Sequence, residues 1–143
     1  MIGKILKEAI DRGACAKANS YSVKDWDSLA RLFFSPQGTE FCLKHEFPSL
    51  EMWREIKQHC DTTAYGIFID EGDVSVQDSR NGLCFIGMTR ANVHCAAAEY
   101  VCRITVCQGA IARIEAKDYS VVKISKDGKS NVKVSKDNTS IIL

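Results

Sequence analysis

The spacing of apolar positions changes near residue 63. Before that point, apolar residues recur at helical spacing in three or four short stretches, each with one apolar and one polar face. The first stretch runs from Ile2 to Ile10 and stops at Gly13. The others begin at candidate caps, which are Ser22 with Asp25, Ser35 followed by Pro36, and Ser49. The pattern predicts a helical region over residues 1–63.

From residue 64 onward the period falls to two, in short apolar runs centred about ten residues apart. The runs are 66–69, 74–76, 83–86, 92–95, 101–106, 110–114, 120–124, 131–134 and 139–143. Strands this short and evenly spaced are typical of a β-solenoid, a sandwich or a barrel.

An internal repeat favours the solenoid. Residues 122–130 read VKISKDGKS and residues 132–140 read VKVSKDNTS, with six of nine positions identical. Gly128 aligns with Asn138, and both residue types tolerate left-handed backbone. Small residues at 96–98, 110, 112 and 116 suit a narrow interior. An antiparallel sandwich or meander, with Lys-Asp-Gly and Lys-Asp-Asn as turns, is the alternative.

We therefore expect an α+β fold, forming one compact unit, in which N-terminal helices (1–63) cap a short C-terminal β-solenoid (64–143). Three faces per coil would give about 30 residues per coil and hence two to three coils. Open solenoid ends must be covered, and the helices are the natural cover for one end. The other end finishes in Ile141, Ile142 and Leu143, which we predict to be a partner interface. Docking of these residues on the chain's own core is the alternative.

Composition narrows the choice of partners and compartment. Of the 143 residues, 45% are hydrophobic, and the net charge is +1, so nothing steers the chain to nucleic acid or to an anionic membrane. No apolar stretch is long enough to span a membrane. Seven cysteines without a paired framework indicate reduced thiols and a cytoplasmic protein. Those in strand-like runs, Cys84, Cys95, Cys102 and Cys107, are expected to be small buried hydrophobes.

Three segments carry a resemblance. They are SPQGTEFCLKH at 35–45 followed by Phe47-Pro48, YGIFID at 65–70 running into GDV at 72–74, and KDNT at 136–139. They resemble an uncharacterised family of small proteins from gut bacteria and their phages or prophages, from about residue 23 onward. The resemblance implies a phage or mobile-element setting and carries no known activity or catalytic residues.

Candidate metal chemistry lies in the helical region. Cys42 and His45 have C-x2-H spacing, and His59-Cys60 follow, so these four could bind zinc if two helices met. Adjacent residues point about 100° apart on a helix, which is awkward for joint ligation. Buried cysteines with interfacial histidines are the alternative, and we expect no cofactor.

Two further clusters are weak candidates for catalysis. His94 adjoins Cys95, but neighbours on a strand face opposite sides, which disfavours a thiol nucleophile built from this pair. Asp70, Glu71 and Asp73 cluster at a turn, where carboxylates could hold calcium or act in acid–base chemistry, as in β-helical polysaccharide lyases. A solvated acidic turn is the alternative.

The C-terminal end is basic, with six Lys against three Asp over residues 117–143. Lys123, Lys126, Lys133 and Lys136 could form a ladder that binds a small anionic ligand. No aromatic residues interleave with them for base stacking. The alternative is a charged outer face that keeps the solenoid soluble.

The sequence contains no phosphate-binding, dinucleotide-binding or nucleophile-elbow motif. Our leading interpretation is a non-enzymatic binding or assembly module that associates with itself or with a protein partner. One alternative is a phage-encoded inhibitor that sequesters a small anionic ligand, such as a signalling nucleotide, between subunits. Another is a small carbohydrate-active β-helix enzyme.

Overall fold

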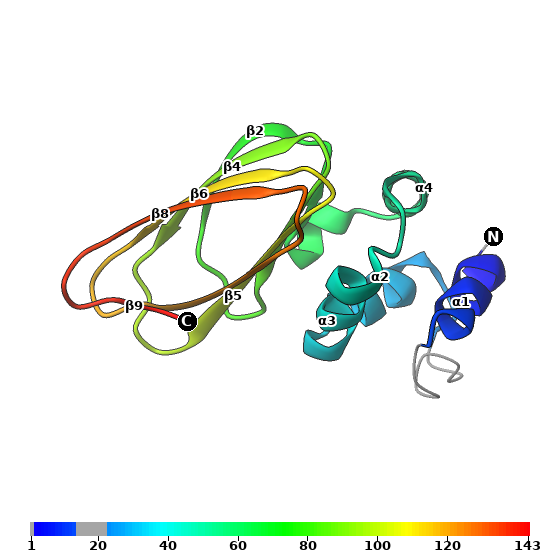
Figure 1. The fold of residues 1–143 in the computed structure, drawn as a ribbon, viewed down its shortest axis with the longest axis horizontal. Coiled ribbons are helices and arrows are strands. Elements are labelled where there is room, and N and C mark those ends of the chain that lie inside the picture. The colour runs from blue at the N-terminus through cyan, green and yellow to red at the C-terminus, as the bar shows by residue number, and fades with distance from the viewer. Residues whose placement is uncertain (1, 14–22) are drawn as a thin grey trace. The chain divides into compact units, whose positions relative to one another are not determined.

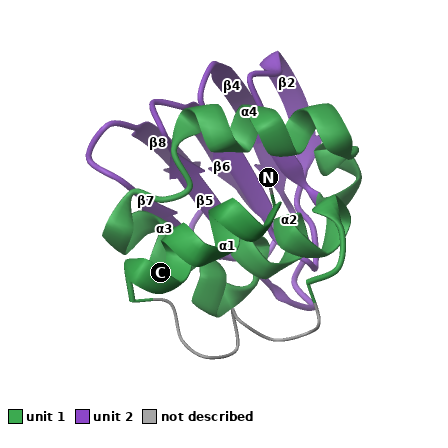
Figure 2. Ribbon diagram, turned by 90° about the vertical axis from the view of Figure 1, so that its right-hand side faces the viewer, with its two compact units in different colours: residues 1–65 green, residues 66–143 purple. Residues whose placement is uncertain are grey.

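The structure, a computed structural model, describes residues 2–13 and 23–143. The chain divides into two compact units, Met1–Tyr65 and Gly66–Leu143 (Figure 2). Within the described residues, the first unit is helical and the second is built of β-strands, which confirms the α+β class. The prediction that the helices cover one end of the solenoid stays a prediction.

The helical unit follows its sequence signals closely. Its elements are α1 (Ile2–Asp11), α2 (Trp26–Phe34), α3 (Pro36–His45), α4 (Leu50–His59) and the 3-10 helix η2 (Thr62–Tyr65). The predicted caps of α3 and α4 are confirmed, because Ser35 accepts from the Gly38 amide and Ser49 from the Met52 amide.

The cap of α2 differs from the prediction. Asp25 is the N-cap, and its carboxylate accepts from the Ser28 amide at 2.8 Å, while Ser28 Oγ accepts from the Asp25 amide at 3.1 Å. The predicted partner, Ser22, lies outside the described residues. Aspartate is as good an N-cap as serine, so the box moves three residues along the chain.

An aromatic cluster holds the helical unit together. The ring of Phe33 on α2 makes edge-to-face contacts with Phe47, at 6.0 Å between centroids, and with Trp53 on α4, at 5.8 Å. All three side chains are buried. Helices of nine or ten residues are marginal alone, so this packing stabilises them.

The second unit is a parallel β-solenoid, as predicted, and the antiparallel alternative is wrong because every strand pair is parallel. Its strands are β1 (Ile67–Ile69), β2 (Gly72–Gln77), β3 (Leu83–Ile86), β4 (Thr89–Cys95), β5 (Val101–Cys107), β6 (Ile111–Ala116), β7 (Val121–Lys126), β8 (Asn131–Lys136) and β9 (Ile141–Ile142). Odd-numbered strands form one sheet and even-numbered strands the other, so the chain alternates between two layers (Figure 1).

The coil has two faces rather than the three we expected. The register pairs Ile67 with Cys84, Leu83 with Ile104, Val101 with Val121 and Val121 with Ile141. Successive partners are thus 17, 21, 20 and 20 residues apart, which gives about four coils instead of two to three. The ten-residue repeat is therefore half a coil. Its two copies lie on β7 and β8, in opposite sheets.

Apolar side chains from the two sheets fill the interior. Phe68 stacks on its register partner Phe85, with centroids 5.3 Å apart. Ala110, Ala112 and Ala116 are buried, as the narrow interior requires. Residues 96–98 were wrongly assigned to the interior, because they form the corner between β4 and β5. Cys84, Cys95, Cys102 and Cys107 are all buried, as expected.

Side chains at the corners bind the backbone of the neighbouring coil. The Asp127 carboxylate accepts from the Gln108 amide at 2.8 Å, and Ser130 Oγ accepts from the Gly109 amide at 3.1 Å. At the opposite corner, Asp137 accepts from the Asp118 amide and Thr139 from the Tyr119 amide, both at 3.0 Å. The repeated Asp position is thus explained by the need to satisfy corner amides, whereas Ser130 and Thr139 lie at different positions of the repeat.

The repeat suggested left-handed backbone at Gly128 and Asn138, but left-handed residues are found at the equivalent corners one coil earlier. Gln108, Gly109, Asp118 and Tyr119 have φ between 57° and 90°. Gly128 and Asn138 are not among the residues of positive φ. The amides of these four residues donate to side chains of the next coil. These hydrogen bonds offset the cost of the left-handed backbone. The corners at Gly128 and Asn138 have no following coil in the described chain to provide such bonds.

Acid should weaken the corner at Asp137. Hydrogen bonds from the Thr139 side chain and then from the Asp118 amide hold the pKa of the Asp137 carboxyl well below its usual value of 3.8. Because the folded pKa is lowered, this carboxylate stabilises the fold above about pH 4, and the contribution is lost as pH falls further. We expect Asp137→Asn to lower the melting temperature at neutral pH, by an amount that shrinks in acid.

The matched control is Asp118→Asn, at the equivalent corner one coil earlier. Both carboxylates are exposed, but within the described residues only that of Asp137 accepts hydrogen bonds from Thr139 and from a corner amide. Thermal unfolding followed by circular dichroism at several pH values should show a smaller change for this variant. A deficit for Asp137→Asn that stays constant from neutral to acid pH would contradict the assigned role.

Candidate functional site

In the last coil, Val134 is exposed although its register partners in earlier coils are buried. Val93, Ile114 and Val134 are register partners in one inward row of the four-stranded sheet. Val93 and Ile114 are buried, whereas Val134, on the final strand of that sheet, is 40% exposed. On the other sheet, Ile141 is 54% exposed in an outward row whose earlier member Val101 is also exposed. Leu143 is 63% exposed, and Ile142 is half-buried against the core. Two of the three predicted interface residues are thus accessible.

The same coil presents strand edges. Strands β8 and β9 come last in their sheets, so within the described chain no strand pairs with their outer sides. The Asn131 amide donates to the Ala110 carbonyl and the Asp137 amide to the Ala116 carbonyl, each at 3.1 Å. Amides alternate in direction along a strand, so those of Val132, Val134 and Lys136 point to the outer edge.

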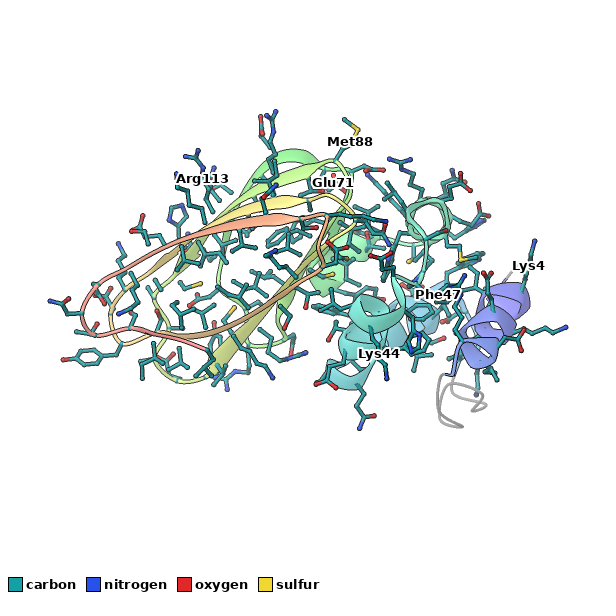
Figure 3. All side chains as sticks on the ribbon, in the orientation of Figure 1. Lys4, Lys44, Phe47, Glu71, Met88 and Arg113 are labelled. Carbon is teal, nitrogen blue, oxygen red and sulfur yellow. The ribbon has the colours of Figure 1, made fainter. Side chains whose placement is uncertain are left out.

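A second candidate site is the outer face of the four-stranded sheet. Ser75, Asn92, Arg113 and Lys133 form one row of register partners across it. His94, Glu115 and Ser135 belong to the next outward row. Residues of both rows line a hollow of about 520 Å³, which we call the outer hollow. The Arg113 side chain extends away from the sheet (Figure 3).

The outer hollow has more basic than acidic side chains, because Arg113 and Lys133 line it together with one carboxylate, Glu115. Within the described residues, neither Arg113 nor Lys133 makes an ion pair, although both are exposed. The acidic residue of the lining, Glu115, lies 3.9 Å from Lys117. The lining contains no Phe, Tyr or Trp. The site therefore has hydrogen-bond donors and charge, and no aromatic platform.

The four predicted lysines do not form one ladder. Lys123 and Lys126 lie on β7, whereas Lys133 and Lys136 lie on β8 in the other sheet. The ammonium groups of Lys126 and Lys136 donate to nearby corner carbonyls at 3.4 Å. Only Lys133 lines the outer hollow. Sequence reasoning missed Arg113 because it assumed a longer coil. The true period would have placed Arg113 beside Lys133.

The candidate zinc ligands each have other neighbours. Cys42 Sγ donates to the Phe33 carbonyl at 3.8 Å, and Cys60 Sγ to the Ile56 carbonyl at 3.5 Å. His59 stacks on Trp26 with centroids 4.3 Å apart, and the ring of His45 lies 4.5 Å from that of Phe41. Among residues 2–13 and 23–143, no three His, Cys, Asp or Glu side chains are grouped as a metal site.

The acidic turn is engaged in holding the coils together. Asp70 Oδ1 accepts from the Met88 amide at 2.8 Å, and Asp73 pairs with Arg90 at 2.9 Å. His94 and Cys95 lie on opposite faces of β4, as expected, since His94 lines the outer hollow and Cys95 is buried. Neither arrangement assembles a catalytic pair.

The buried thiols Cys95 and Cys102 contact each other inside the solenoid. The hydrogen bond between them, together with burial, raises the pKa of the Cys95 thiol. A high pKa leaves little thiolate, which is the reactive form. Cys60 is half-exposed, and burial followed by the nearby Asp27 raises its pKa as well.

Comparisons with protein-family models, with curated proteins and with solved structures gave no match to this chain. No described helix is long and apolar enough to cross a membrane. The class of protein is therefore defined by the fold alone. It is a parallel, two-sheet β-solenoid with a helical unit before it.

Alkylation with iodoacetamide at mildly alkaline pH, mapped by peptide mass spectrometry, should distinguish the described cysteines. We expect Cys60 to react first, because the other five are buried, and Cys95 and Cys102 to react only after unfolding. In denaturant all six should react alike, which serves as the control. Labelling of Cys95 or Cys102 at the rate of Cys60 in the folded protein would contradict this burial.

Proposed function

We propose that the protein is a non-enzymatic assembly module whose last coil, β8 and β9, pairs with a second copy of the chain. The observation that carries the proposal is the exposure of Val134 at 40%, in a row whose other members are covered by the next coil. An inward valine on a stacked solenoid is covered only when another strand lies beyond it.

The chemistry of the edge supports a strand as the occupant. Outward-directed amides and carbonyls of β8 need partners, and an added β-strand provides them along the whole edge. Apolar side chains next to that edge, including Ile141 and Leu143, add area that water otherwise contacts. A strand therefore satisfies both the backbone and the side chains.

A second copy fits this edge by symmetry. A two-fold axis perpendicular to both sheets would pair β8 with β8 and β9 with β9 in antiparallel fashion. Both sheets would continue across the interface, and the open core of each copy would cover the other. Such an interface is closed, so association stops at a dimer. The phage or mobile-element setting stays a prediction.

Sedimentation velocity over a dilution series tests the proposal with a matched pair of variants. Strand β8 already carries Lys136 at an inward register position, and Val134→Lys adds a second inward charge nearer the middle of the edge, a change that disfavours edge pairing. We expect it to weaken dimerisation by about tenfold or more, equivalent to at least about 1.4 kcal/mol. The control is Ile111→Lys, which substitutes an equally β-branched residue of 39% exposure on the interior strand β6.

Two further measurements separate loss of pairing from loss of folding. Melting temperatures of both variants show whether each remains folded. Hydrogen exchange should show protection of the Val132, Val134 and Lys136 amides that increases with protein concentration. A chain that remains monomeric at all concentrations, or equal weakening by both variants, would overturn the proposal.

A further inference from the structure

The outer hollow contains an arrangement of charge that the assembly proposal does not explain. Arg113 and Lys133 are direct register partners on adjacent strands, whose axes are about 4.8 Å apart. Like charges placed directly opposite on one face of a sheet repel each other. Neither residue forms an ion pair within the described residues, although Glu115 of the next row also lines the hollow.

The neighbouring groups are also donors. Asn92 precedes Arg113 in the same row, and Ser75 precedes Asn92. An amide and a hydroxyl beside two cations can each donate to an oxygen of a bound anion. The guanidinium of Arg113 offers a planar fork that matches two oxygens of one group, and Lys133 adds a point charge.

We propose that the outer hollow binds the phosphate group of a small phosphorylated ligand. Two adjacent cations match a dianionic group better than a single negative charge. A volume of about 520 Å³ accommodates a phosphate with a small attached group. Without aromatic side chains in the lining, recognition rests on the phosphate and not on a stacked base.

This inference does not depend on the proposed dimer. Arg113 lies on β6, an interior strand, so its substitution leaves the β8 edge intact. Lys133 lies on β8 itself, and its variant reports on both sites. A variant of Arg113 therefore tests the phosphate site alone, and comparing it with a variant of Lys133 distinguishes a wrong phosphate site from a wrong assembly proposal.

The sheets supply an internal control for charge. Lys123 occupies the position of Lys133 in the other copy of the ten-residue repeat and is also exposed. Its register partner is Arg103, so β5 and β7 carry the same pairing of Arg with Lys outside the outer hollow. Lys123→Gln removes the same charge from the same local sequence.

Titration of the full chain with inorganic phosphate at constant ionic strength, followed by amide chemical shifts in NMR spectra, tests the site. We expect saturable shifts centred on Asn92, Arg113 and Lys133, with a dissociation constant on the order of 1 mM because the hollow is open to solvent. Arg113→Gln and Lys133→Gln should each weaken binding by about tenfold. Lys123→Gln should leave the dissociation constant unchanged.

The same titration contains the results that would overturn the inference. Shifts spread over all lysines, or equal weakening by Lys123→Gln, would show general charge screening. An equal response to acetate at matched concentration would overturn the assignment to phosphate. Retained binding in Arg113→Gln, with the melting temperature unchanged, would remove the outer hollow as the site.

Discussion

In a parallel solenoid, each side chain must lie over its register partner in the coil before it, and this stacking constraint shapes the rest of the second unit. Inward rows are therefore mainly apolar, as in the row of Val93, Ile114 and Val134. Two other inward rows are apolar in the earlier coils and end in Lys126 and Lys136. The corners are constrained as well, because backbone amides there that have no partner in a neighbouring strand need other hydrogen-bond acceptors. Asp127 and Asp137 supply them from the coil that follows. Apolar stacking and corner hydrogen bonds thus support each other in every coil.

The constraint also decides which polar groups are available for function. Two of the carboxylates that the sequence offered as catalytic or calcium-binding candidates instead make contacts between neighbouring coils. Asp70 binds a backbone amide, and Asp73 pairs with Arg90. The basic side chains Arg113 and Lys133 have no such role, because they project from the outer face of the sheet. The outer hollow therefore offers a ligand two cationic side chains and one carboxylate, Glu115.

Strand β8 contributes to both proposed sites, and Val134 borders both of them. Its outward side chains, Lys133 and Ser135, line the outer hollow, and its inward Val134 lies at the open end of the core. Its backbone amides alternate between β6 and the outer edge. One strand thus presents charge, apolar area and backbone donors in three directions. The position of Arg113 on β6 keeps the two sites experimentally separable.

The sequence by itself determined the elements of both units. Helical spacing with Ser35 and Ser49 as caps located α3 and α4, because capping is a local interaction between residues three apart. The period of two located all nine strands, and the ten-residue repeat favoured a solenoid over an antiparallel sandwich or meander. These signals depend on neighbours in the chain, so they can be read without the fold.

Only the tertiary structure decided the length of the coil, and with it the neighbours of every outward residue. A ten-residue repeat is equally consistent with two or three faces per coil, because both repeat the same strand and turn. With two faces, Lys133 lies beside Arg113, and Lys123 is on the opposite sheet. The contacts that form the outer hollow and the open edge join residues about 20 positions apart, and no local interaction specifies that distance.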